Sequence, residues 1–403
     1  MNELEVMDFE KKYMANVYSK KPIVITKGKG ALLWDLDGRE YIDCMSNYGV
    51  SLVGHSHPKV IEEIKKQSEL LISCHGSLYN ETRSIFLEKI VKITPKELNK
   101  VYFANSGAES IECALKLARK FTGKPEVIAM MGAYHGKTFG ALSATWNQKY
   151  RKSFEPLVPG FKHVPYGNSE KVRENITERT AAVLVEPIQG EGGVKVPPPT
   201  FLQELREICD EKGTLLIVDE VQTGLGRTGK MFACQHSQIT PDIMCLAKSI
   251  AGGLPLGLTM AKEDIMSSFK VGDHSTTFGG NALTCAAATA VLKIIEEENL
   301  PDRAADLGSR IMANMKELQN DCKIIREVRG LGLMIGLEFR FDVLNIIMKA
   351  LENGLLVLDA GRNIVRLLPP LVISQDQLDK AFGILSAIIR EEENERLRKT
   401  DSN

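Results

Sequence analysis

Asp219 and Lys248 are the two residues whose types and positions suggest chemistry most directly. Asp219 follows the apolar run LLIV, which places its carboxylate at the end of an expected buried strand, and Lys248 lies in LAKSIAGGLPLG among small residues. A buried carboxylate can keep a pyridine nitrogen protonated, and a lysine amine can bind an aldehyde covalently. The pair therefore favours pyridoxal 5′-phosphate (PLP) as a cofactor. A helix-capping aspartate and a solvated lysine are the alternatives, but the apolar run and the small neighbours weigh against both.

A turn at residues 105–108 is a candidate for binding the cofactor phosphate. The segment VYFANSGAESIECALKLARK predicts a short strand, a tight turn and a helix with apolar residues at helical spacing. The N-terminus of a helix binds anions through its backbone N–H groups, and Gly107 lets the backbone approach one closely. We therefore expect Ser106, Gly107 and Ala108 at the phosphate. A plain helix cap by Ser106 or Asn105 is the alternative.

The cofactor ring also needs a wall on each face. Val221 lies two residues after Asp219, so the two side chains point to the same side of a strand, and Val221 would lie beneath the ring. Gln222 follows and could donate to the phenolic oxygen. Tyr134, in a glycine-bracketed turn after EVIAMM, is the candidate for the opposite wall. An exposed loop tyrosine is the alternative there.

The segment GLGRTG at residues 224–229 matches the G-x-G-x-x-G spelling of a dinucleotide fingerprint. That fingerprint requires an amphipathic helix directly after it, at the first strand of a βαβ unit. The following KMFACQHSQITPDI contains no convincing amphipathic helix. We therefore expect no nicotinamide site.

The expected elements that position these residues alternate between strands and amphipathic helices from about residue 98 to residue 260. This alternation predicts a mostly parallel, seven-stranded α/β sheet sandwiched by helices. From about residue 285 the pattern changes to a long helix followed by a smaller α+β domain. The expected domains are a large PLP-binding domain over 51–285 and a C-terminal small domain over 286–403. The expected strands are 101–103, 126–131, 162–166, 181–187, 215–220, 243–248 and 256–261.

Composition excludes several other classes of protein. The 403 residues carry a net charge of −1, with 43% hydrophobic and 26% charged residues, which is typical of a globular protein without a nucleic-acid footprint. The N-terminus is charged, and no long apolar run predicts a membrane span. The eight cysteines lack zinc-site spacing, so we expect no metal, reduced thiols and a cytoplasmic location.

Nine sequence blocks occur in a fixed order: LWDLDGREYIDCMSNYGVSLVGHSHPKV, FANSGAESIECALKLAR, GAYHGKTFGALSAT, VEPIQGEGG, LLIVDEVQTGLGRTG, LAKSIAGGLPLG, TTFGGNALTCAAA, REVRGLGLMIGLE and IVRLLPPLVI. With these blocks the chain resembles the class III, fold-type I PLP-dependent aminotransferases over nearly its whole length. The branch it resembles contains acetylornithine aminotransferase and the carrier-protein-linked lysine and ornithine aminotransferases. The resemblance implies the PLP-dependent transferase fold of type I, with residues 1–50 packing against the small domain.

The resemblance also implies roles for individual residues. Tyr134 and His135 would lie at the cofactor, and Thr277 would reach the phosphate of the partner subunit's cofactor, which implies a homodimer with shared active sites. Arg366 would bind the α-carboxylate of 2-oxoglutarate, the acceptor that leaves as glutamate. Glu186 would neutralise Arg366 when the other substrate binds. A plain structural salt bridge is the alternative for Glu186.

The chain departs from the family at Lys137, where arginine usually binds the carboxylate of the amino donor. Lysine is a point charge rather than a planar fork, so it selects carboxylate geometry less strictly. This departure fits a larger or differently presented donor. Lys149, Arg151 and Lys152 follow closely and could form a basic rim that attracts a small acidic amino-group carrier protein. Solvated surface residues are the alternative for these three.

The favoured function is transfer of a terminal amino group between a carrier-linked or N-acetylated lysine or ornithine and 2-oxoglutarate, in lysine or arginine biosynthesis. Ornithine or 4-aminobutyrate aminotransferase is one alternative. An aminomutase of the glutamate-1-semialdehyde type is another, and it would need neither external 2-oxoglutarate nor a switch at Arg366. A catalytically silent PLP-binding protein is disfavoured because Asp219, Gln222, Lys248 and Thr277 are all present.

Overall fold

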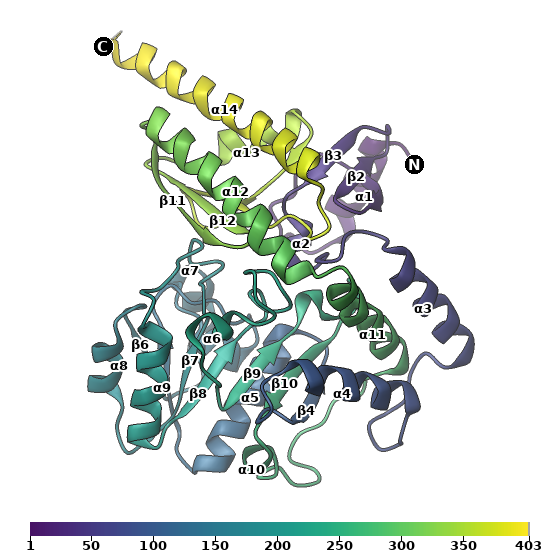
Figure 1. The fold of residues 1–403 in the computed structure, drawn as a ribbon, viewed down its shortest axis with the longest axis vertical. Coiled ribbons are helices and arrows are strands. Elements are labelled where there is room, and N and C mark those ends of the chain that lie inside the picture. The colour runs from purple at the N-terminus through teal and green to yellow at the C-terminus, as the bar shows by residue number, and fades with distance from the viewer. Residues whose placement is uncertain (402–403) are drawn as a thin grey trace.

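The computed structural model describes residues 1–401, with side chains described as far as residue 398. Figure 1 shows the central portion of the chain as a lower α/β part, while both ends of the chain lie together in an upper part. The last two residues of the expected small domain lie outside the described residues.

The lower part is built on a seven-stranded sheet in the order β4-β10-β9-β8-β7-β5-β6. β10 runs antiparallel to both of its neighbours, and the remaining pairs are parallel. The expected α/β fold with a mostly parallel seven-stranded sheet is confirmed. The strands are β4 (Lys100–Ala104), β5 (Glu126–Met130), β6 (Phe161–Val164), β7 (Thr180–Val185), β8 (Leu215–Asp219), β9 (Ile243–Leu246) and β10 (Gly257–Ala261).

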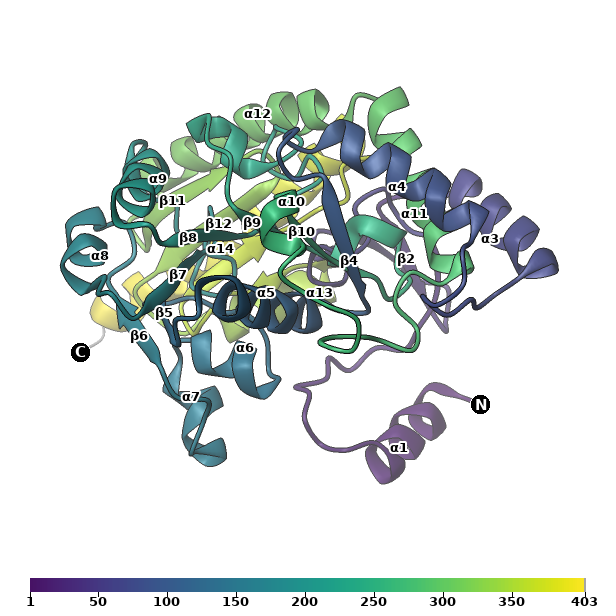
Figure 2. The ribbon, with the colours of Figure 1, turned by 90° about the horizontal axis from the view of Figure 1, so that it is seen from below.

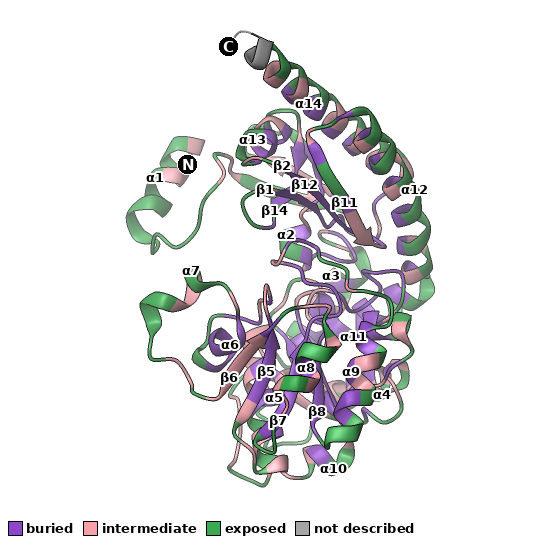
Figure 3. Cartoon of the chain, turned by 90° about the vertical axis from the view of Figure 1, so that its left-hand side faces the viewer, coloured by how far each residue is buried: buried purple, intermediate pink, exposed green. Residues whose placement is uncertain are grey.

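Helices cover both faces of this sheet, which is why its central strands are apolar throughout. Figure 2 shows α5 (Gly107–Thr122) and α6 (Phe139–Ala144) on one side, with α8 (Ser169–Asn175) and α9 (Phe201–Lys212) on the other. Alternate residues of β8 serve the two faces: Ile217 packs in the cluster around α5, and Val218 packs in the cluster that includes α9. Figure 3 shows the central strands β5, β7 and β8 as buried.

The upper part contains two further sheets, and the first of them joins the two ends of the chain. β13 (Leu355–Leu356) pairs in parallel with β3 (Glu40–Asp43), so C-terminal residues complete a sheet begun by β1 (Ile25–Lys29) and β2 (Leu32–Asp35). The second sheet has the order β11-β12-β15-β14. Its strands and the helices beside them are β11 (Ile325–Leu331), β12 (Met334–Phe339), β14 (Leu358–Asp359), β15 (Ile364–Leu367), α12 (Leu300–Asp321), α13 (Leu344–Glu352) and α14 (Gln375–Asp401). The domain boundaries near residues 50 and 285 stay predictions.

The remaining elements connect these parts or lie at their surface. α1 (Glu3–Tyr13) buries none of its residues and stands apart from the rest of the chain in Figures 2 and 3. Within residues 1–401, no helix combines the length and apolar character needed to cross a bilayer. A cytoplasmic location stays a prediction. The other helices are α2 (Ser46–Gly49), α3 (Pro58–Leu70), α4 (Glu81–Ile93), α7 (Gln148–Arg151), η1 (Lys152–Phe154), η2 (Ala233–Ser237), η3 (Lys248–Ala251), α10 (Glu263–Met266) and α11 (Ala282–Glu297).

Candidate active site

A cavity of about 210 Å³ lies where the carboxyl ends of β5, β7, β8 and β9 meet the start of α5. This edge of an open α/β sheet is where such folds bind ligands, because loops diverge there and leave a crevice. The cavity brings together most of the residues singled out from the sequence. Its lining is Gly107, Ala108, Tyr134, His135, Gly136, Lys137, Glu186, Ile188, Glu191, Asp219, Val221, Gln222, Thr223 and Lys248.

The N-terminus of α5 forms one end of this cavity. Ser106 is its N-cap, and the Ser106 Oγ accepts from the Glu109 N–H, so the serine side chain performs the capping role weighed as the alternative. The N–H groups of Gly107 and Ala108 find no acceptor among the described residues. A Cβ at Gly107 would lie 2.9 Å from Val221 Cγ1, so glycine keeps this corner open. Free N–H groups at a helix N-terminus suit a phosphate.

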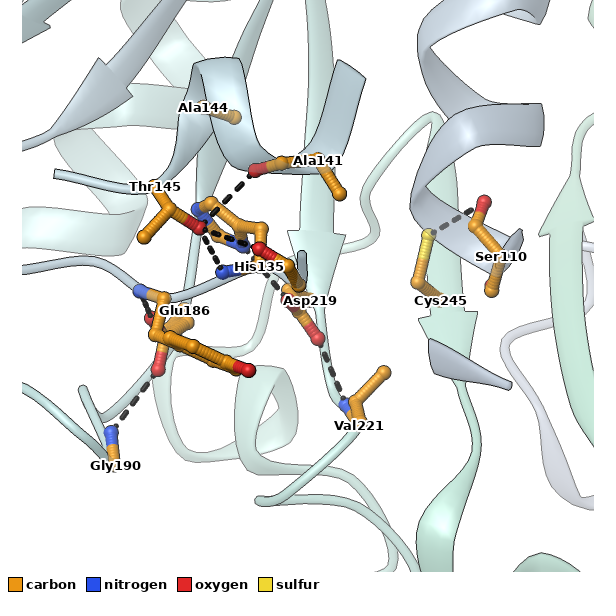
Figure 4. A network of polar contacts seen from close by, with 12 residues as sticks. Ser110, His135, Ala141, Ala144, Thr145, Glu186, Gly190, Asp219, Val221 and Cys245 are labelled. Carbon is orange, nitrogen blue, oxygen red and sulfur yellow. Dashed lines mark hydrogen bonds and ion pairs between the residues drawn. The ribbon is translucent and has the colours of Figure 1, made fainter. Parts of the chain in front are cut away.

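Asp219 ends β8 and lies between His135 and Val221 in the polar network of Figure 4. Its Oδ2 lies 2.7 Å from Nδ1 of the buried His135, and its Oδ1 accepts from the Val221 N–H at 3.0 Å. These two contacts fix the plane of the carboxylate. The His135 Nε2 has no hydrogen-bond partner in the described structure. The contact through Nδ1 makes His135 a residue that orients Asp219, and residue spacing alone did not predict this contact.

Lys248 faces the same cavity from the turn after β9. It is the first residue of η3 and has a positive φ of 46°, a strained backbone for a residue with a side chain. Within residues 1–398 its ammonium makes no hydrogen bond or ion pair. Burial lowers the pKa of Lys248, and the nearby Arg366 adds to this effect, while Glu191, Asp219 and Glu186 oppose it. An amine with a lowered pKa is more often neutral and therefore nucleophilic.

Tyr134 lies in the turn after β5 and lines the cavity. Burial raises the pKa of its hydroxyl to about 12, and the nearby Glu191 and Tyr150 add to this shift, so the ring stays neutral. Tyr150 packs against it edge-on, with ring centroids 5.8 Å apart and an angle of 78° between the ring planes. The ring is thus available as a flat apolar wall.

Arg366 lies on β15 with its side chain fully buried, and its partner differs from the expected one. Its Nη1 lies 2.7 Å from Glu191 Oε1 and donates to Gln222 Oε1 at 3.2 Å, while Nη2 donates to the Asp359 carbonyl. Tyr48 lies beneath the guanidinium, with 5.8 Å from Cζ to the ring centroid. The expected pairing of Arg366 with Glu186 is wrong in this structure.

Glu186 instead accepts from the backbone N–H groups of Tyr134 and Gly190, at 2.8 and 3.0 Å (Figure 4). Burial raises the pKa of Glu186 to about 7, and its neighbour Asp219 adds to the shift while His135 opposes it. Glu186 therefore stabilises the backbone at Tyr134 and Gly190 and does not pair with Arg366. The sequence signal that marks Glu191 is the pair of glycines that follows it, which lets the loop turn back toward the cavity.

The two remaining residues lie at or beyond the cavity rim. Lys137 is exposed and lines the cavity, with its Nζ 5.1 Å from the centroid of the Tyr150 ring. Thr277 is exposed and is absent from the lining. Its predicted contact belongs to a partner subunit, so it stays a prediction.

The GLGRTG segment follows β8 as a series of turns with no helix after it, and η2 is a short 3₁₀ turn. The Arg227 side chain is buried, and its Nη1 donates to the Leu333 and Pro369 carbonyls of the upper part. The segment therefore joins the two parts of the molecule.

The class-III aminotransferase family matches residues 13–389. The chain belongs to this family. It is 48% identical to an acetylornithine aminotransferase of Methanopyrus kandleri, over 97% of this chain and 99% of that protein. It is 42% identical to a [LysW]-aminoadipate semialdehyde transaminase of Deinococcus radiodurans, over 98% of this chain and 93% of that protein. The ornithine aminotransferase structure of Toxoplasma gondii, with PLP partly occupying its active site, superposes with a TM-score of 0.95 at 35% identity, over 98% and 96% of the two chains.

Class-III aminotransferases use PLP, and the residues of this cavity fit that cofactor. The free N–H groups of Gly107 and Ala108 would hold the phosphate, Asp219 would hold a proton on the ring nitrogen, and Tyr134 and Val221 would flank the ring. When bound, PLP supplies an electron sink for negative charge at the carbon that bears the amine. Lys248 Nζ can accept the proton from that carbon in its neutral form and return it in its charged form.

Proposed function

We propose that this enzyme transfers the terminal amine of a lysine- or ornithine-type donor, blocked at its α-amine by an acetyl group or a carrier protein, to 2-oxoglutarate. The observation that carries the proposal is a pair of cations at one site: Lys137 lines the cavity, and Arg366 contacts the lining residues Glu191 and Gln222. Arg366 pairs with Glu191, and Lys137 pairs with no carboxylate in the described residues. Two cations suit two carboxylate substrates that use the site in turn.

The similarity to enzymes named for acetylornithine and for [LysW]-aminoadipate semialdehyde supports a blocked donor. The basic rim of Lys149, Arg151 and Lys152 lies on α7 and η1, next to Lys137, and suits an acidic carrier protein. The Glu191–Arg366 pair favours a two-substrate transaminase over an aminomutase. A transaminase alternates between two substrates, and an internal carboxylate can neutralise Arg366 when the substrate present places no carboxylate there.

Lys137 provides the direct test. Lys137→Ala should weaken the donor half-reaction about tenfold and spare the 2-oxoglutarate half-reaction, which Arg366 anchors. This is the low end for a charged hydrogen bond, because Lys137 is exposed. Stopped-flow absorbance of the bound cofactor measures the two half-reactions separately. An equal loss in both would contradict a donor-binding role.

The same assay distinguishes the donors and the alternative reactions. Acetylornithine, carrier-linked lysine, free ornithine and 4-aminobutyrate should be compared at low and high salt. Affinity for a carrier-linked donor should fall with salt, because Lys149 and Lys152 of the basic rim are exposed and act through screened charge. Turnover of glutamate 1-semialdehyde without 2-oxoglutarate would instead support an aminomutase.

We further propose a homodimer with shared active sites, in which Thr277 serves the neighbouring subunit. Mixing Lys248→Ala with Thr277→Ala protein, after subunit exchange, should then restore activity. In such a hybrid one site combines an intact Lys248 with the other subunit's intact Thr277. Hybrid dimers that stay inactive would place both residues in the same subunit's site.

A further inference from the structure

Lys137 in the cavity lining and Arg366 behind that lining are held in opposite ways. Arg366 is buried and already carries the Glu191 carboxylate at 2.7 Å. Lys137 is exposed, and within residues 1–398 its ammonium makes no hydrogen bond or ion pair. It lies instead over the Tyr150 ring, 5.1 Å from the centroid. Arg366 is therefore already neutralised by an internal carboxylate, and Lys137 is not.

An aromatic ring and a carboxylate restrain a lysine with different consequences. The face of the ring attracts the ammonium through its quadrupole but leaves the positive charge intact. A carboxylate would neutralise the ammonium and would have to leave before a substrate carboxylate could bind. A free lysine also loses side-chain entropy when it is fixed. A ring that holds the side chain beforehand reduces this cost without blocking the site.

Tyr150 is itself fixed, so it can serve as such a support. It lies on the short helix α7, whose N-cap Asn147 accepts from the Lys149 N–H at 2.9 Å and from the Tyr150 N–H at 3.0 Å. The half-buried ring meets Tyr134 edge-on at 5.8 Å. Burial raises the pKa of the Tyr150 hydroxyl, and Glu191 and Asp359 add to this shift, so the ring remains neutral beside the lysine.

We propose that Tyr150 is a positioning residue that holds Lys137 as a permanently open carboxylate subsite for the amino donor. The donor then enters without displacing an internal carboxylate, whereas 2-oxoglutarate must displace Glu191 from Arg366. This inference rests on the proposed donor role of Lys137 and adds the residue that prepares it.

The test uses the PLP-loaded enzyme with N-acetylornithine in one half-reaction and 2-oxoglutarate in the other. Tyr150→Leu should raise the apparent dissociation constant of the donor about two- to thirtyfold, the range that cation–π contacts span. Tyr150→Phe keeps the ring face and should stay within about twofold of the parent enzyme. The 2-oxoglutarate half-reaction should be unchanged in both variants. Lys124→Met, outside the cavity lining, is the control for the loss of one positive charge in the Lys137→Met variant of the double-mutant cycle.

A double-mutant cycle separates positioning from a general structural effect. If Tyr150 acts through Lys137, then Tyr150→Leu should add nothing to Lys137→Met, because the interaction is already absent. Additive losses, or equal losses in both half-reactions, would overturn the inference. Should Tyr150→Leu fail to fold, Tyr150→Met removes the ring with an unbranched, more adaptable side chain and carries the same predictions.

Glu191→Gln supplies an independent arm. It weakens the internal partner of Arg366, so it should tighten 2-oxoglutarate binding and change the apparent dissociation constant of the donor less. A donor affinity that changes as much as that of 2-oxoglutarate would mean that the donor subsite is gated too, which contradicts the inference. If Lys137→Met leaves the donor unaffected, the proposed donor role fails. If Lys137→Met weakens the donor and Tyr150→Leu does not, only the inference about Tyr150 fails.

Discussion

Replacing Lys248 with alanine should reduce turnover by at least about 10²–10⁴-fold, the contribution of a positioned general base. Lys248 faces the cavity without a hydrogen-bond partner in the described residues, and burial lowers its pKa, so the neutral form that accepts a proton is more populated than for a solvated lysine. The loss should appear in both half-reactions, because the same amine serves each. Steady-state and stopped-flow rates measure it.

A spectroscopic measurement separates this role from folding. The parent enzyme should be yellow, and borohydride should bleach its absorbance band and fix the cofactor to the chain. The Lys248→Ala protein should release its cofactor on gel filtration. Lys230→Ala, on the exposed end of the loop after β8, is the matched control and should behave like the parent enzyme. A fully active Lys248→Ala protein would remove Lys248 from the mechanism.

Much of the central sheet could be predicted because its strands are continuous apolar runs separated by helical spacing. Such a pattern is local in the sequence, and both faces of the sheet require it. Asp219 and Val221 could be placed for the same reason, since position along one strand determines which side chains share a side. The turn and helix at Ser106 carried an equally local signal.

The contacts that could not be predicted depend on how distant segments meet. Glu186 and Glu191 lie in one short motif, and both are carboxylates at the same loop. Only the path of the backbone through Gly190, Gly192 and Gly193 decides which of them reaches Arg366. The support of Lys137 by Tyr150 likewise depends on the packing of α7, a single turn with little helical signal of its own.

Replacing Asp219 with asparagine should retain part of the cofactor binding but lower turnover about 10²–10³-fold, comparable to the loss of one preorganised electrostatic contact. Asparagine has nearly the same shape and can still accept from the Val221 N–H. It lacks the negative charge that would keep a proton on the ring nitrogen, so negative charge on the reacting carbon would be less stabilised. Both half-reactions should slow, and the absorbance spectrum of the bound cofactor should shift.

Asp242 offers the matched control, because it is a second buried aspartate at the opposite edge of the same sheet. Its carboxylate pairs with Arg206 at 2.8 Å and with Lys262 at 2.6 Å and accepts from the Leu216 N–H. Asp242→Asn should therefore lower the thermal midpoint and leave turnover of the folded enzyme near normal. Asp219→Asn should show the reverse. If Asp219→Asn lowered only the thermal midpoint, Asp219 would be a structural carboxylate like Asp242, and the ring nitrogen would need another partner.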